Sequence, residues 1–112
     1  MNYTKMTDFE INFEVAKAQG YDTQVAQHFG LNGLSTVRTT EKHVDFCNSW
    51  ADAGPIIEDS KLCLVYEDSK QFWSACFFDF DNKYKNKVGT TDKNPLRAAM
   101  VVFLMMQEKN DE

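Results

Sequence analysis

Arg97 lies in segment 94–97, whose residue types are those of a helix start. Asn94 suits the N-cap, and Pro95 suits the first helical position, where its missing N–H leaves no bond unmade. An arginine in the first turn opposes the helix dipole, which favours negative charge at that end. We therefore expect Arg97 to bind an anion or a carboxylate. The alternative is an ordinary capped helix with a solvated or paired arginine. The internal carboxylates considered for this pairing are Asp52, Glu58 and Asp79.

Trp50, Asp52, Trp73 and Arg97 could together line a small pocket. Tryptophans beside an acid and a bent helix can form the wall of a site for a small molecule or a nucleotide. The alternative is that the two tryptophans lie at the edge of the core and that Asp52 only caps a helix. A binding site at these four residues is the only hypothesis from the sequence in which the protein would be an enzyme.

The other chemically capable residues form no catalytic or metal-binding pattern. His28 and His43 belong to no zinc motif, and Cys47, four residues after His43, allows at most a two-ligand site. Ser74 lacks the flanking glycines of a hydrolase nucleophile, and no phosphate-binding GK[ST] loop is present. We therefore expect no catalytic residues, no metal and no cofactor, and the interpretation leans away from an enzyme.

Segment 81–93, DNKYKNKVGTTDK, is the only hint of nucleic-acid binding. Its four lysines surround Tyr84, and basic residues interleaved with aromatics can support single strands. Lysines in a polar loop are more often simply solvated. The whole chain carries a net charge of -5, which disfavours binding to a phosphate backbone.

Length and composition indicate one soluble domain of 112 residues with its own core. The three cysteines, Cys47, Cys63 and Cys76, are odd in number and show no C-x-x-C spacing, so we expect reduced thiols and a cytoplasmic protein. The first ten residues do not resemble a signal peptide. The longest apolar run, residues 98–106, has nine residues, whereas a membrane span needs about 20.

The first half of the chain predicts two helices. Thr7 and Glu10 have the spacing of a capping box, so we expect a helix over about 8–19, ended by Gly20. Segment 25–29 could form a helical turn, and 36–40 a short edge strand. Ser49 and Asp52 predict the start of a second helix. Pro55 should kink this helix or make it restart there.

The second half predicts a hairpin followed by a buried helix. Residues 62–66 are apolar at every position, which predicts a strand buried on both faces. Residues 71–80 predict a central strand after a loop at 68–70. The last helix is apolar nearly all round, so it needs either a sheet over it or a second subunit. The residues proposed for such self-association are Met100, Phe103 and Leu104.

These elements predict a single α+β domain with three helices and a small, mainly antiparallel sheet of three or four strands. The last helix should be buried on the sheet, against the first helix.

Three stretches, YTKMTDFEIN, CNSWADAGPIIE and NPLRAAMVVFLMMQ, together resemble the NinX-like family of small bacteriophage and prophage proteins. The resemblance covers most of the chain and is weakest over 21–42. Family members often have Pro where Trp50 stands here. The resemblance implies a phage accessory protein in the bacterial cytoplasm and supplies no catalytic residues.

The leading hypothesis is therefore a non-enzymatic protein that binds a host or phage protein, with a homodimer as the first candidate. The alternatives are a pocket near Trp50, Asp52, Trp73 and Arg97, or weak nucleic-acid binding through 81–93.

Overall fold

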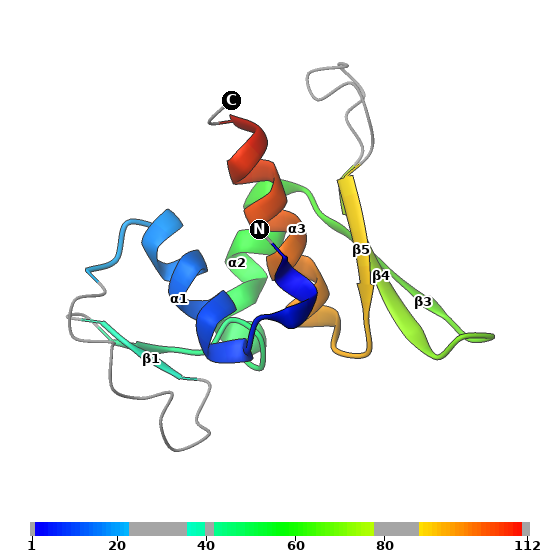
Figure 1. The fold of residues 1–112 in the computed structure, drawn as a ribbon, viewed down its shortest axis with the longest axis horizontal. Coiled ribbons are helices and arrows are strands. Elements are labelled where there is room, and N and C mark those ends of the chain that lie inside the picture. Colours follow the sequence, from blue (N-terminus) through cyan, green and yellow to red (C-terminus); the bar gives the residue numbers. More distant parts are fainter. Residues whose placement is uncertain (1, 23–35, 40–41, 78–87, 111–112) are drawn as a thin grey trace.

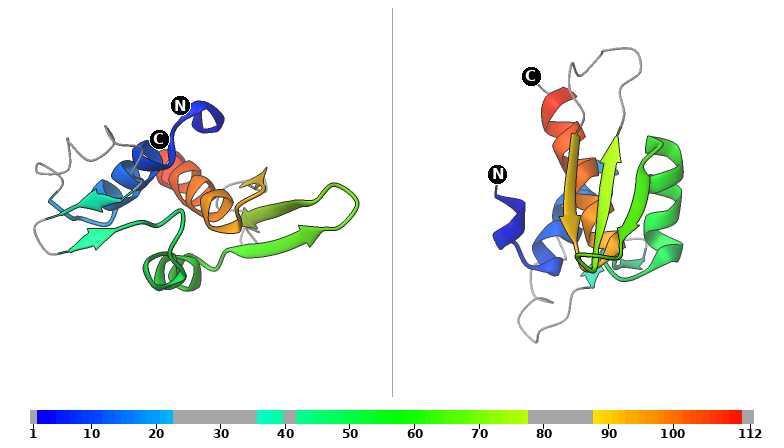
Figure 2. Two further views of the ribbon diagram at one scale, coloured as in Figure 1. Left: turned by 90° about the horizontal axis from the view of Figure 1, so that it is seen from below. Right: turned by 90° about the vertical axis from the view of Figure 1, so that its right-hand side faces the viewer.

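The computed structural model describes residues 2–22, 36–39, 42–77 and 88–110, and it shows an α+β fold built around its last helix (Figure 1). This helix, α3 (Pro95–Asn110), packs against α1 (Asp8–Ala18), α2 (Trp50–Ser60) and one face of a three-stranded sheet. Figure 2 shows α3 between the sheet and the other two helices. The predicted burial of the last helix on the sheet and against the first helix is confirmed.

The apolar side chains all round α3 pack into the chain's own core. Met100 has no exposed surface, and Phe103 and Leu104 are buried beside it. We expected these three residues to offer a surface for self-association, and this expectation needs correction. Because α1, α2 and the sheet already surround them, a second subunit has no access to them.

The larger sheet is antiparallel and contains β3 (Cys63–Glu67), β4 (Phe72–Phe77) and β5 (Val88–Asp92) in that order. As predicted, β4 is the central strand and β3 and β4 form a hairpin. The hairpin turn is closed by the amides of Lys70 and Gln71, which both donate to the carbonyl of Glu67. Leu64 and Ala75 are direct cross-strand partners on the face that packs towards α3.

The prediction that 62–66 is buried on both faces was wrong. Cys63, Val65 and Tyr66 are exposed. A continuous apolar run suits a strand covered on both sides. β3, however, is an edge strand, and among the described residues no helix packs on the outer face of its sheet.

A smaller, two-stranded sheet pairs β1 (Val37–Arg38) with β2 (His43–Val44). Val37 and Val44 face each other and are both buried. The short strand predicted at 36–40 is confirmed for its described part. The helical turn predicted at 25–29 lies outside the described residues.

The capping residues predicted where α1 and α2 begin. Thr7 and Glu10 form the predicted capping box at the start of α1. Ser49 caps α2 by accepting from the amide of Asp52, but the Asp52 carboxylate accepts from the amide of Asp45 instead of completing a box. α2 continues through Pro55, so the predicted restart of the helix at this residue was wrong.

Candidate functional site

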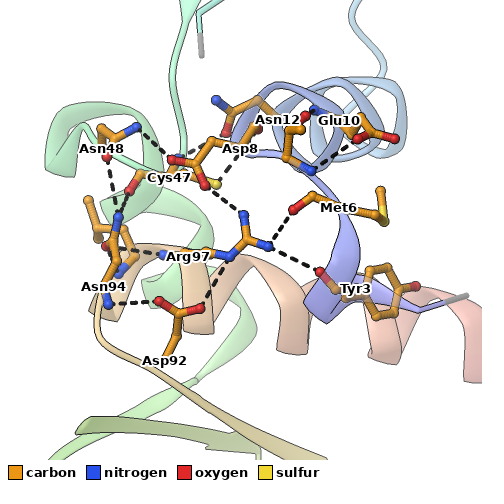
Figure 3. Close-up of polar contacts among 12 residues, drawn as sticks. Tyr3, Met6, Asp8, Glu10, Asn12, Cys47, Asn48, Asp92, Asn94 and Arg97 are labelled. Carbon is orange, nitrogen blue, oxygen red and sulfur yellow. Dashed lines mark hydrogen bonds and ion pairs between the residues drawn. The ribbon is translucent and has the colours of Figure 1, made fainter. Parts of the chain in front are cut away.

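Arg97 is the centre of the most connected polar group in the described residues (Figure 3). Its Nη1 lies 2.6 Å from Oδ1 of Asp8, and its Nε lies 3.2 Å from Oδ2 of Asp92. Its Nη2 donates to the carbonyls of Met6, at 2.6 Å, and Tyr3, at 3.1 Å. We call these five residues the Arg97 cluster. With a side chain only 13% exposed, Arg97 is held by both carboxylates and by the N-terminal turn, which is the short 3-10 helix Tyr3–Lys5 with its C-cap Met6.

The expectation that a carboxylate compensates Arg97 is confirmed, but the two named candidates that the structure describes, Asp52 and Glu58, were wrong. Asp52 binds a backbone amide instead, Glu58 is exposed, and Asp79 lies outside the described residues. Asp92 reaches Arg97 because β5 ends just before α3 begins, which turns its carboxylate back over the helix start. Asp8 reaches it because the start of α1 lies against the same end of α3.

Asn94 links this cluster to the turn before α2. Its Oδ1 accepts from the amides of Leu96 and Arg97, as expected of an N-cap. Its Nδ2 donates to the carbonyl of Cys47 at 2.6 Å and to Oδ1 of Asn48. The Asn94 side chain therefore satisfies both the helix start and the neighbouring turn.

The turn before α2 is also fastened to α1. The fully buried Asn12 donates to Oδ1 of Asp45 at 2.8 Å and accepts from the amide of Cys47 at 2.9 Å. A buried amide side chain costs free energy unless its donor and acceptor are both bonded, and here both are. Figure 3 shows how Asn12, Cys47 and Asn94 continue the network away from Arg97.

Cys47 is the thiol nearest to this network, and its surroundings make it a poor nucleophile. Burial raises the pKa of the Cys47 thiol far above its ordinary value, and the negative charge of Asp8 raises it further against the opposing charge of Arg97. Its Sγ donates weakly to the carbonyl of Asp8. Since the thiolate is the reactive form, a thiol that stays protonated at neutral pH is not prepared for nucleophilic catalysis.

The four residues proposed for a pocket are not joined in one site. Trp50 is 58% exposed at the start of α2, and Trp73 packs on Tyr66, with their ring centroids 5.3 Å apart. No hydrogen bond, ion pair or ring contact connects any two of Trp50, Asp52, Trp73 and Arg97, all of which the structure describes. A narrow space beside Arg97 is lined by none of the other three.

A hollow of about 480 Å³ lies on the outer face of the sheet. It is open and is lined by Ser74, Cys76, Gly89 and Thr91, together with backbone of the same strands. These side chains are small and uncharged, so they provide neither an acid–base pair nor an anchor for an ion. Within the described part of the chain, no group of three or more His, Cys, Asp or Glu is placed to hold a metal.

Every buried side-chain nitrogen and oxygen of the described residues has a hydrogen-bond partner. Arg97 donates to the chain's own carboxylates and carbonyls. The arrangement therefore joins the N-terminal turn, α1, β5 and α3.

Comparison with known proteins identifies a relationship over nearly the whole chain. Residues 2–107 match the family model described as bacteriophage P22, NinX. No curated protein matches the chain. Among the described residues, no helix has the length and apolar character that crossing a membrane would require.

Proposed function

We propose that this chain, which belongs to the bacteriophage P22 NinX family, is a non-enzymatic phage protein that works by binding another protein. The single observation that carries this proposal is the exposed apolar surface of the β3–β4 hairpin. The residues of this hairpin surface are Val65, Tyr66, Phe72 and Trp73.

This hairpin surface is unusual for a small domain of net charge -5. Val65 is 54% exposed, Tyr66 44% and Phe72 36%, and they are three of the four exposed large hydrophobic residues in the described part of the chain. Single exposed apolar residues are common, but several on one short hairpin, spread over both of its faces, are typical of a contact site. Aromatic residues are also enriched where proteins bind proteins.

The hairpin is placed for contact with a partner. It extends away from the helices at the side of the molecule opposite α1 (Figures 1 and 2). Tyr66 and Trp73 form an aromatic pair on one face of the hairpin, whereas Val65 and Phe72 lie on the other. A partner could therefore contact the hairpin from either face or along its edge.

The partner in this proposal is a host or phage protein in the bacterial cytoplasm. The three cysteines are free, which suits a reducing compartment. Nucleic-acid binding through 81–93 remains a prediction, since most of that segment lies outside the described residues. A pocket near Arg97 also remains a prediction, but the separate partners of Trp50, Asp52, Trp73 and Arg97 give it no support.

The test compares a double variant with a single control substitution in a tagged copy expressed during phage infection. We expect a specific protein to co-purify with the native chain and to be lost from the double variant Tyr66→Ser, Phe72→Ser. Trp50→Ser is the matched control, because Trp50 is also an exposed aromatic residue, more exposed than either, but lies on α2. If the hairpin variant remains folded by circular dichroism and keeps every partner of the native chain, the proposal is wrong.

A further inference from the structure

The two edges of the three-stranded sheet differ in a way that singles out β3. β5 has the sequence VGTTD, with one glycine and three polar residues, and the N-terminal turn with Tyr3 and Thr4 lies beside it. β3 has the sequence CLVYE, and within the described residues no other strand pairs with its outer edge. Natural edge strands are normally protected by charges, proline, a bulge or a covering segment. β3 carries one charge, Glu67, at its very end.

An unprotected edge strand offers backbone N–H and C=O groups to another strand. The sequence around β3 indicates which strand fits. Residues 62–66 read LCLVY, and this segment is self-complementary when two copies run antiparallel about Leu64. In that register Leu62 lies opposite Tyr66 of the second copy, and Cys63 opposite Val65. Lys61 is the left-handed C-cap of α2 and stays outside the pairing. Leu64 then meets its own equivalent at the two-fold axis.

We propose that two copies of this chain associate by pairing their β3 strands antiparallel, with the two-fold axis at Leu64. A two-fold interface uses the same patch on both subunits, so that patch must be complementary to itself. The register meets this condition over residues 62–66, because apolar residues face apolar residues there. The inference deepens the proposed function, since it uses part of the same hairpin surface and names the first partner as a second copy.

The register also agrees with the two faces of the sheet. Leu62, Leu64 and Tyr66 share the face that packs towards α3, and Cys63 and Val65 share the outer face. Directly opposite residues of antiparallel strands lie on the same face of a sheet. The paired sheet therefore has six strands, with the helices of both copies on one side, and the half-exposed Tyr66 gains an apolar neighbour.

Neighbouring registers lose this complementarity. An axis at Val65 would put the apolar Cys63 opposite the charged Glu67. An axis at Cys63 would put Tyr66 opposite Ser60, which lies in α2 and cannot pair with a strand. A shift by an odd number of residues also turns one copy over, because successive residues face opposite sides of a strand. A single strand contact is a small interface, so we expect monomer and dimer to exchange rather than form a permanent complex.

Disulfide cross-linking tests the register directly. Two chains are made in a Cys76→Ala background, because Cys76 lies opposite Cys63 within each hairpin and would compete for it. One chain keeps Cys63, and the other carries Cys63→Ser and Val65→Cys. Opposite residues have Cα atoms roughly 4.5–5.5 Å apart, which a disulfide can span. Equivalent residues of two copies, Cys63 with Cys63 or position 65 with position 65, are roughly 8 Å apart in this register, beyond the limit of about 7 Å.

We therefore expect mild oxidation to give a covalent dimer when the two chains are mixed, and none when either chain is alone. A tag on one chain identifies the mixed dimer by its mass. Cross-linking of either chain alone, without a mixed product, would overturn the register. Cross-linking in no combination would overturn the dimer.

Sedimentation over a wide concentration range measures the association of the native chain. We expect a species of twice the 12.9 kDa chain mass to grow with concentration. Val65→Lys should weaken the dimer at least about tenfold, because it puts a charge opposite Cys63 twice in each dimer. Val65→Thr, which keeps the strand preference, should weaken it less.

The outcomes separate this inference from the proposed function. A chain that stays monomeric at all concentrations refutes the β3 dimer. If the Tyr66→Ser, Phe72→Ser variant nevertheless loses its co-purifying protein, the proposed function stands with a different partner. If that variant keeps the protein, the proposed function is refuted as well.

Discussion

Replacing Arg97 by methionine tests whether the Arg97 cluster holds the fold together. Methionine is similar in length but removes the charge and all donors. The change leaves the carboxylates of Asp8 and Asp92 without their cation and removes the donor from the carbonyls of Tyr3 and Met6. The loss should therefore be felt at β5, which directly precedes α3, and at the N-terminal turn and α1, which lie at the other end of the chain.

The expected magnitude follows from the exposure of the partners. Breaking a buried ion pair by removing one member costs about 3–5 kcal/mol. The side chains of Asp8 and Asp92 are 35% and 31% exposed, so water can partly replace the arginine. We therefore expect the free energy of unfolding to fall by about 3 kcal/mol, with a midpoint of thermal unfolding lower by roughly 12 °C for a domain of this size.

Urea unfolding, followed by circular dichroism, measures this loss. The free energy of unfolding should fall with urea concentration at the same slope in the variant as in the native chain, because the surface exposed on unfolding is unchanged. Arg97→Lys keeps the charge but not the planar fork, so it should lie between the native chain and Arg97→Met. Lys17→Met is the matched control, since it removes only surface contacts, an ion pair with Glu14 and a contact with the Phe13 ring, and should cost less than about 1 kcal/mol.

One outcome of the urea assay would refute this reasoning. If Arg97→Met loses less than about 1 kcal/mol with an unchanged urea slope, the cluster does not stabilise the fold as its geometry indicates. Hydrogen exchange gives a local check, because the amide of Met6 should exchange faster in the variant once the N-terminal turn is released.

Three further substitutions test other parts of the structure. Asn94→Ala removes the N-cap of α3 and the donor to the Cys47 carbonyl, and should lower the free energy of unfolding by about 2 kcal/mol in the same urea assay. Met100→Ala leaves a cavity in the centre of the core and should cost about 3 kcal/mol, and a near-neutral result would contradict the burial of α3. Burial keeps the pKa of Cys47 above its ordinary value of 9.0. Above this pH the folded state therefore holds a proton that the unfolded state loses. The free energy of unfolding should then fall by about 1.4 kcal/mol per pH unit. Cys47→Ala should remove this fall between pH 9.0 and 10.0. The interval ends at pH 10.0 because the raised pKa of Tyr3 begins to lower stability there in the same way. An unchanged slope in the interval would show that Cys47 does not cause the fall.

The sequence predicted what depends on near neighbours. The capping box of Thr7 and Glu10, and the cap at Asn94, use residues within three positions of each other. Their geometry is therefore decided by the local chain. The apolar residues nearly all round α3 are also a property of the local sequence, and they predicted its burial.

The sequence did not predict what depends on topology. Asp8 is 89 positions from Arg97, and nothing in the local pattern distinguishes it from Asp52 or Glu58. The exposure of β3 was missed because its apolar composition is the same as that of a strand covered on both faces. Only the strand order shows that β3 lies at an edge.

The exposure of β3 has a simple geometric cause. A helix with its side chains is about 10 Å wide, and neighbouring strands are about 4.8 Å apart. One helix can therefore cover about two strands. In the described structure α3 packs on β4 and β5, while β3 makes its main contacts with β4. Within the described residues, the third strand of the sheet is thus left beyond the reach of the helix that covers the other two. Its residues Val65 and Tyr66 are exposed there, which is why a partner is expected at β3 rather than at the Arg97 cluster, whose donors are already bound to the chain's own carboxylates and carbonyls.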